Sequence, residues 1–167
     1  MKLIIFGAPG SGKGTQAQLV AHHFHLKHLS VGELLRHEAE HDKKLSLLLE
    51  EGDLVADKMS FQAVKKHLPS DQFLLDGFPR TAEQAELLDS ITEIDAVLYL
   101  EVRHEEVIKR LLKRGRADDT REVIKHRLQI YHEETEAVLE HYKDKIVRIN
   151  GNQSVDVVYE EICEKLL

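Results

Sequence analysis

Hydrophobic and polar positions follow two patterns along this chain of 167 residues. Short apolar runs at residues 2–6, 28–29, 72–75, 95–100 and 146–149 are typical of buried strands. Between them, apolar residues recur at spacings of three and four. This spacing predicts helices over about 12–24, 30–40, 44–51, 57–67, 81–89, 107–114, 120–141 and 155–166. In the first helix we expect Leu19, Val20 and Phe24 to face inward.

The order of these elements indicates an α/β fold. Strands that alternate with helices favour a parallel sheet covered on both faces by right-handed crossovers. The length suits one domain. Ligands of such sheets bind at the carboxyl ends of the strands. We therefore expect residues 7–15, the helix start at Ser30 and the turn at residues 76–80 to share one cleft.

Residues 7–15, with the sequence GAPGSGKGT, have the composition of a phosphate-binding loop. Glycines let successive backbone N–H groups point at one anion, and Lys13 adds a positive charge. Thr15 can offer its hydroxyl to a magnesium ion. The general pattern G-x-x-x-x-G-K-[ST] is met through Lys13, but Gly14 follows, so the hydroxyl comes one position late.

Composition narrows the class of partner. Acidic residues outnumber basic ones 30 to 23, and the resulting net charge of −7 predicts no general attraction to nucleic acid or to anionic membranes. No run approaches the roughly 20 apolar residues of a membrane span. The single cysteine, Cys163, is expected to be a buried or half-buried thiol in a reducing compartment. The eleven histidines are expected to be solvated.

Two polar residues flank the turn after the third predicted strand. Asp76 could merely cap the turn, but beside a phosphate loop it is better interpreted as an outer ligand of magnesium, often through water. Arg80 could lie free on the surface, yet its guanidinium fork suits a phosphate at the same edge.

A second basic segment, Arg114-Gly115-Arg116, lies at the end of a predicted helix. Charge runs usually decorate a solvated helix face, and we keep that interpretation for Arg121. Arg114 and Arg116 precede Asp118 and Asp119, whose carboxylates could hold the two arginines in place by forming ion pairs. Because phosphoryl transfer needs positive groups around the moving phosphoryl, this segment is a candidate closing element.

Five segments together resemble the adenylate kinases, and the resemblance runs nearly end to end. They are Lys13-Gly14-Thr15-Gln16, residues 29–36 (LSVGELLR), residues 52–57 (GDLVAD), residues 76–81 (DGFPRT) with Gln84, and residues 115–119 (GRADD) ahead of Arg127. Gly-Lys-Gly-Thr is that family's form of the loop, which accounts for Gly14.

The resemblance implies a fold and a reaction. The fold would be one P-loop kinase domain over residues 1–167, with a three-layer core at 1–29, 60–109 and 120–167, a helical monophosphate-binding insertion at about 30–59 and an unusually short lid at about 110–119. The reaction would be Mg2+-dependent phosphoryl transfer from ATP to AMP, giving two ADP, in a cytoplasmic monomer. A lid without cysteines would hold no structural zinc.

The resemblance also assigns roles to single residues. ATP would be bound by Gly10, Ser11, Gly12, Lys13, Gly14, Thr15, Arg110, Arg114 and Gln153. AMP would be bound by Ser30, Val31, Arg36, Asp53, Leu54, Val55, Gly77, Arg80, Gln84, Arg116 and Arg127. Catalysis would depend on Lys13, Arg80, Arg114, Arg116 and Arg127, and magnesium on Thr15 and Asp76, partly through water.

One position departs from the family pattern at the acceptor site. The family's helix start usually reads Ser-Thr-Gly-Asp, whereas Val31 here brings no hydroxyl to the acceptor's base. A UMP or CMP kinase is one alternative, although Thr81 and Gln84 favour AMP, because those kinases tend to carry asparagine after the Pro-Arg pair. A nucleotide-binding module without catalysis is the other alternative.

Overall fold

The protein is built on a five-stranded parallel sheet. The computed structural model describes residues 1–51, 57–117 and 119–167. Its strands are β1 (Lys2–Gly7), β2 (Lys27–Ser30), β3 (Phe73–Asp76), β4 (Ala96–Glu101) and β5 (Ile146–Asn150), in the spatial order β2-β3-β1-β4-β5. Every neighbouring pair runs parallel. The predicted α/β class and parallel sheet are therefore confirmed.

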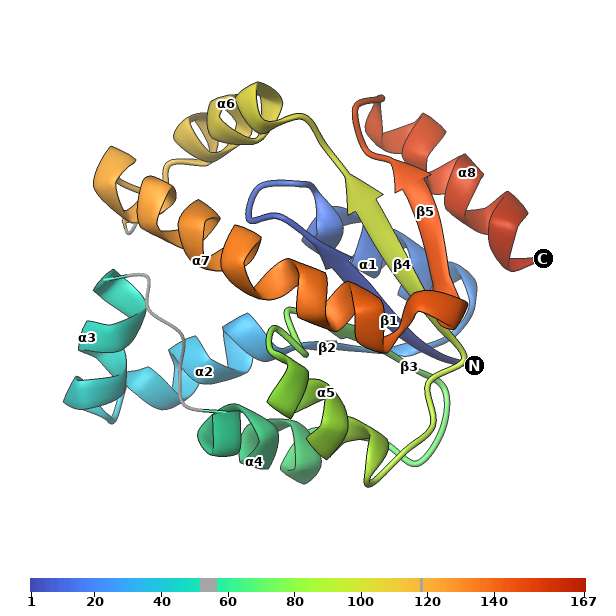
Figure 1. The fold of residues 1–167 in the computed structure, drawn as a ribbon, viewed down its shortest axis with the longest axis horizontal. Helices are drawn as coiled ribbons and strands as arrows, with labels where there is room; N and C mark the ends of the chain where they lie inside the picture. The colour runs from blue at the N-terminus through green and yellow to red at the C-terminus, as the bar shows by residue number, and fades with distance from the viewer. Residues whose placement is uncertain (52–56, 118) are drawn as a thin grey trace.

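Helices cover both faces of the sheet (Figure 1). One face packs against α1 (Lys13–His23) and α8 (Val155–Leu166), and the other against α2 (Val31–Ala39), α4 (Asp57–His67), α5 (Ala82–Asp89) and α7 (Arg121–His141). Residues of β1 alternate between the two cores, because successive strand side chains point to opposite faces. Leu3 and Ile5 join the first core, and Ile4 and Phe6 the second.

The predicted elements are present, with small differences at their ends. Leu19 was expected to face inward, but it is 37% exposed, whereas its neighbour Val20 is fully buried. Consecutive helix residues point about 100° apart, and the buried face of α1 is made by Gln16, Ala17, Val20 and Ala21. Helix α6 (His104–Arg114) begins three residues before its predicted start. Two glutamates in its first turn favour that extension.

Helix starts differ in how they are capped. The spacing of Ser30 and Glu33 predicts a capping box, but the Ser30 side chain makes no capping hydrogen bond. Both residues instead line the cleft described below. The hydroxyls of Thr81, Thr120 and Ser154 do accept a hydrogen bond from the backbone N–H three residues later. These caps fix the starts of α5, α7 and α8.

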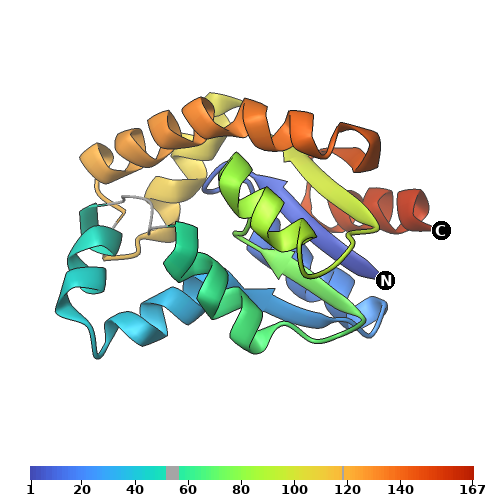
Figure 2. The ribbon, with the colours of Figure 1, turned by 60° about the horizontal axis from the view of Figure 1, so that its bottom comes forward.

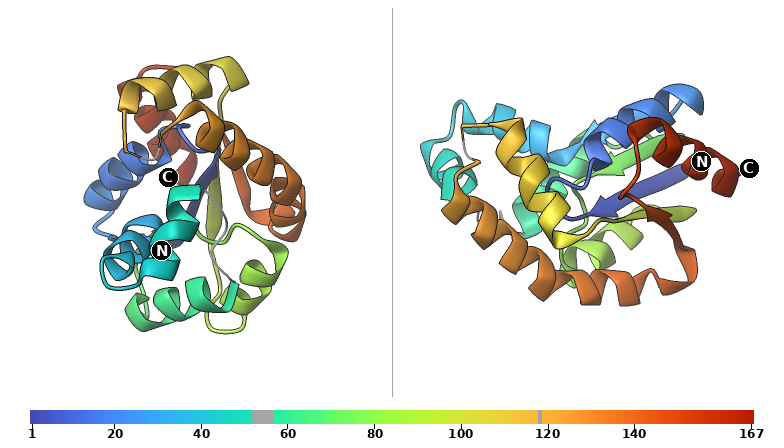
Figure 3. Two further views of the ribbon diagram at one scale, coloured as in Figure 1. Left: turned by 90° about the vertical axis from the view of Figure 1, so that its left-hand side faces the viewer. Right: turned by 90° about the horizontal axis from the view of Figure 1, so that it is seen from above.

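Two elements project beyond the carboxyl edge of the sheet. One is the pair formed by α2 and α3 (Lys43–Glu51), and the other is the connection between α6 and α7 (Figures 2 and 3). Helix α7 contacts the first of these elements, because Arg127 donates from Nη2 to the backbone oxygen of Leu49 in α3, at 3.4 Å. The cleft is therefore bounded by α3 on one side and by α7 on the other.

Candidate active site

The loop between β1 and α1 has the backbone conformation of an anion cradle. Gly10 and Gly12 have φ of 82° and 93°, in the left-handed region that favours glycine. A Cβ on Gly10 would lie 2.6 Å from Leu111 Cγ, so no side chain fits there. Gly12 is the N-cap of α1, and the N-terminus of that helix favours negative charge.

Lys13 carries the charge of this loop. Its Nζ donates to the backbone oxygen of Ala8, at 3.4 Å. Burial lowers the pKa of Lys13 to about 8; the charge of Asp76 opposes this shift, whereas those of Arg80 and Arg114 add to it. Such a lysine gains its full charge when a polyanion binds beside it.

Asp76, at the carboxyl end of β3, is a buried carboxylate facing the loop. Burial opposes its ionisation, but nearby His28 and the charge of Lys13 outweigh this effect and hold the pKa of Asp76 below its usual value. The His28 Nε2 atom lies 3.7 Å from Asp76 Oδ2 and has no hydrogen-bond partner among the described residues. The carboxylate is therefore charged at neutral pH.

The surroundings of Asp76 fit a hydrated magnesium ion. A Cβ on Gly14 would lie 3.5 Å from Asp76 Oδ2, so the missing side chain leaves the space in front of the carboxylate open. Thr15 lines the same cavity. A carboxylate and a hydroxyl are hard oxygen ligands of the kind that Mg2+ prefers. The glycine that departs from the general loop pattern thus leaves room for such an ion.

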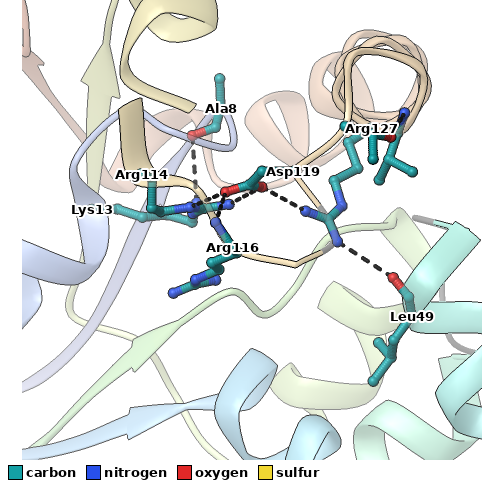
Figure 4. A network of polar contacts seen from close by, with 9 residues as sticks. Ala8, Lys13, Leu49, Arg114, Arg116, Asp119 and Arg127 are labelled. Carbon is teal, nitrogen blue, oxygen red and sulfur yellow. Dashed lines mark hydrogen bonds and ion pairs between the residues drawn. The ribbon is translucent and has the colours of Figure 1, made fainter. Parts of the chain in front are cut away.

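Asp119 gathers the arginines of the α6–α7 connection (Figure 4). Its side chain is fully buried and accepts hydrogen bonds from Arg114 Nε at 2.8 Å and Nη2 at 2.7 Å. The backbone N–H of Arg116 donates to it at 3.1 Å, and Arg127 Nη1 lies 3.5 Å away. Burial opposes ionisation, but these partners hold the pKa of Asp119 below its usual value. One carboxylate thus fixes three residues of the predicted basic group.

Two further arginines lie over glycines on the opposite side of the cleft. Arg80 Nε donates to the backbone oxygen of Gly77, at 3.0 Å. A Cβ on Gly32 would come within 3.3 Å of Arg36 Nη1, and one on Gly77 within 3.5 Å of Arg80 Nη2. The glycines therefore allow both guanidiniums to lie close to the backbone.

The cleft contains two cavities. The smaller, of about 170 Å3, lies between the α2–α3 pair, α5 and α7, and includes Val31, Gln84 and Tyr131 in its lining. Gln84 Oε1 accepts the backbone N–H of Arg80 at 2.7 Å, which fixes the direction of its amide.

The larger cavity, of about 610 Å3, follows the phosphate loop toward the β5–α8 connection. Arg110 crosses it by donating from Nη1 to the backbone oxygen of Ser11, at 3.2 Å, and from Nη2 to that of Gly151, at 3.0 Å. Gln153 lies at its far end and donates to the backbone oxygen of Asn150.

The structure brings together nearly all of the predicted site residues. Those that line one or both cavities are Gly10, Ser11, Gly12, Lys13, Gly14, Thr15, Ser30, Val31, Arg36, Asp76, Gly77, Arg80, Gln84, Arg110, Arg114, Arg116, Arg127 and Gln153. The predicted residues Asp53, Leu54 and Val55 lie outside the described part of the chain.

Sequence reasoning missed several residues of the cleft, among them His28. His28 was expected to be solvated, but its side chain is only 19% exposed and lies beside Asp76. Its position two residues before Ser30, on the same face of a strand, was the available signal. Tyr131 and Glu134 also line the smaller cavity. They follow Arg127 by four and seven residues, a spacing that places all three on one face of a helix.

Within the described residues, no group of three histidine, cysteine, aspartate or glutamate side chains is placed to hold a metal ion. No described helix is long and apolar enough to cross a membrane.

Comparison with known proteins agrees with the geometry. A family model described as adenylate kinase matches residues 5–147. An adenylate kinase of Mycobacteroides abscessus is 39% identical, over 99% of each chain. One of Prochlorococcus marinus is 43% identical, over 92% of this chain and 90% of the relative, and one of Azobacteroides pseudotrichonymphae is 41% identical, over 97% and 95%. The chain belongs to the adenylate kinase family.

Proposed function

We propose that this protein transfers the terminal phosphoryl group of ATP to AMP and releases two ADP. The observation that carries the proposal is the shared wall of the two cavities, which both include Lys13, Arg36, Arg80, Arg114 and Arg116. Two polyanions can meet only where their charges are neutralised, and a wall of basic side chains between two adjoining cavities does this.

The larger cavity is the donor site in this proposal. Backbone N–H groups of residues 10–15 and the N-terminus of α1 would hold the ATP phosphates, with Lys13 as the cation. Arg110 and Gln153, farther along the cavity, would contact the base. The magnesium ion that accompanies ATP would be held by Thr15 and Asp76, partly through water, and it neutralises charge on the donor phosphates when bound.

The smaller cavity is the acceptor site. Arg36 and Arg80 would bind the phosphate of AMP, and Gln84 and Val31 would line its base. Ser30, Gly77 and the backbone of residues 53–55 remain proposed members of this site. The relatives named above are adenylate kinases, which supports AMP over a pyrimidine acceptor.

The transfer needs no covalent enzyme intermediate. An oxygen of the AMP phosphate attacks the γ-phosphorus of ATP, and the bond from that phosphorus to the β-phosphate oxygen breaks with its electron pair, which leaves on ADP. Arg114, Arg116 and Arg127 would surround the moving phosphoryl. Holding both nucleotides in line supplies much of the rate enhancement, because it removes the entropy cost of their encounter.

Further parts of the proposal concern the whole chain. The protein is proposed to act as a monomer. ATP, AMP and a lone reduced thiol, Cys163, suit the cytoplasm. The insertion at about 30–59 and the lid at about 110–119 are proposed to close over the substrates and exclude water.

A panel of monophosphates tests the proposal. ADP formation from ATP and Mg2+ is measured with AMP, CMP, UMP or GMP as acceptor, and AMP is expected to give the highest kcat/KM. Lys13→Ala is expected to lower turnover at least about a hundredfold with the fold intact by circular dichroism. Faster reaction with CMP or UMP would overturn the choice of acceptor. Nucleotide binding without ADP formation would identify a binding module.

A further inference from the structure

Glu134 is a carboxylate of the acceptor cavity that the proposed reaction does not use. It is half-buried on α7 and lines the smaller cavity. No described residue donates a hydrogen bond to it or forms an ion pair with it. Its neighbour Glu133, by contrast, is exposed and accepts a hydrogen bond from Gln129 at 3.0 Å. Glu134 is thus an anionic acceptor left open to the cavity.

The position of Glu134 along α7 places it away from the phosphate end. Seven residues separate it from Arg127, which corresponds to about 10 Å along the helix axis. Arg127 belongs to the basic cluster, whereas Tyr131 and Glu134 continue the same helix face toward the remote part of the cavity. Helix α5, which carries Gln84, packs against α7 through the hydrogen bond from Tyr142 Oη to Asp89 Oδ1, at 3.0 Å. Gln84 and Glu134 both line this smaller cavity, which is the proposed acceptor site.

Gln84 has a fixed orientation in this space. The backbone N–H of Arg80 can only donate, so the Gln84 atom 2.7 Å away is the amide oxygen. The amide nitrogen then has no hydrogen-bond partner among the described residues and is left to donate into the cavity. Val31 contributes no hydroxyl. The Gln84 amide thus offers a donor to the base, and a strong acceptor has to come from another residue.

We propose that Glu134 selects the acceptor base by accepting a hydrogen bond from its exocyclic amino group, directly or through one water, while Gln84 donates to the adjacent unprotonated ring nitrogen. This inference rests on the proposed function and names the chemical class of its acceptor. Adenine presents this pair of groups. Hypoxanthine has nearly the same shape but presents a carbonyl oxygen, which the carboxylate repels, and a protonated ring nitrogen.

The test compares AMP with IMP, which differ at the base edge alone. The preference is the ratio of kcat/KM for the two acceptors, measured for the wild-type protein, Glu134→Gln and the matched control Glu133→Gln. Glutamine can also donate, so Glu134→Gln is expected to reduce the preference for AMP about tenfold or more, mainly through the KM for AMP, with the KM for ATP unchanged. The control is expected to stay within about twofold of wild type.

Calorimetric binding of AMP and IMP to the same three proteins separates the two proposals. An unchanged AMP preference in a folded Glu134→Gln protein, in both turnover and binding, would overturn the role of Glu134. Absence of phosphoryl transfer to every monophosphate would overturn the proposed function instead. In that case the binding ratios still decide the role of Glu134.

Discussion

Lys13 lies where burial and neighbouring arginines oppose its charge. Its pKa of about 8 means that the free protein carries a charged Lys13 below that pH and a neutral one above it. Bound phosphates stabilise the charged form and raise the pKa again. ATP binding is therefore linked to the uptake of one proton above pH 8.

The affinity for ATP is expected to be nearly constant below pH 8 and to weaken above it, by at most about tenfold per pH unit for one linked proton. The dissociation constant, measured by calorimetry from pH 7 to 9.5 at constant Mg2+, checks this. Lys13→Arg is the control, because arginine keeps its charge over that range. An equal pH dependence in the Lys13→Arg protein would refute the link to Lys13.

Asp119 acts through the arginines that it holds. Asp119→Asn keeps the size of the side chain but loses the charge that pairs with Arg114 and Arg127. We expect kcat to fall roughly 10- to 100-fold, because misplaced arginine side chains no longer meet the phosphoryl. Steady-state kinetics measure this loss, and Asp144→Asn, at an exposed position, is the control variant. A kcat equal to wild type would show that Asp119 does not position these arginines.

At the scale of elements, the phosphate loop is held by α6. Val107 and Leu111 form a small core with Ile124 and Leu128 of α7, and Gly10 of the loop lies directly against Leu111. The loop, the basic connection and the start of α7 therefore share one packing unit. A substitution that disrupts the contact between Gly10 and α6 should therefore disturb the loop, the basic connection and the start of α7.

Gly10→Ala is expected to destabilise the fold by about 2 kcal/mol or more. The added Cβ would lie 2.6 Å from Leu111 Cγ and 3.1 Å from the Val107 oxygen, at a φ that alanine disfavours. Urea unfolding followed by circular dichroism measures the loss. Gly14→Ala is the matched control, because its Cβ would make only an ordinary contact within a helix, so its stability should equal or exceed wild type. Equal stability of both variants would contradict this packing.

Element type and order could be predicted from the sequence because apolar spacing differs between strands and helices. The phosphate loop could be found because its glycines and lysine are consecutive in sequence. Leu19 was misplaced because periodicity does not fix the phase of a helix to one residue. The absent cap on Ser30 could not be foreseen, because whether that hydroxyl bonds to the helix or faces the cleft depends on tertiary contacts.

At the scale of the molecule, the sheet order makes the site. Strands β2, β3 and β1 are neighbours, so Ser30, Asp76 and the phosphate loop arrive at one edge although they are far apart in sequence. This convergence could be predicted, since parallel strands end on the same side. The position of Glu134 in the smaller cavity could not be predicted, because it depends on how α7 is rotated against α5. The contact between Arg127 and Leu49 likewise depends on tertiary packing.

The central claim is that two nucleotides exchange a phosphoryl group across the shared basic wall. The most direct test supplies ADP and Mg2+ alone and follows the products by 31P NMR. The account predicts ATP and AMP in equal amounts, because each cavity then holds one ADP, and it predicts product formation at least about a hundredfold slower with Lys13→Ala. A protein that hydrolyses nucleotides would release inorganic phosphate without making ATP, and that result, or no reaction at all, would contradict the account.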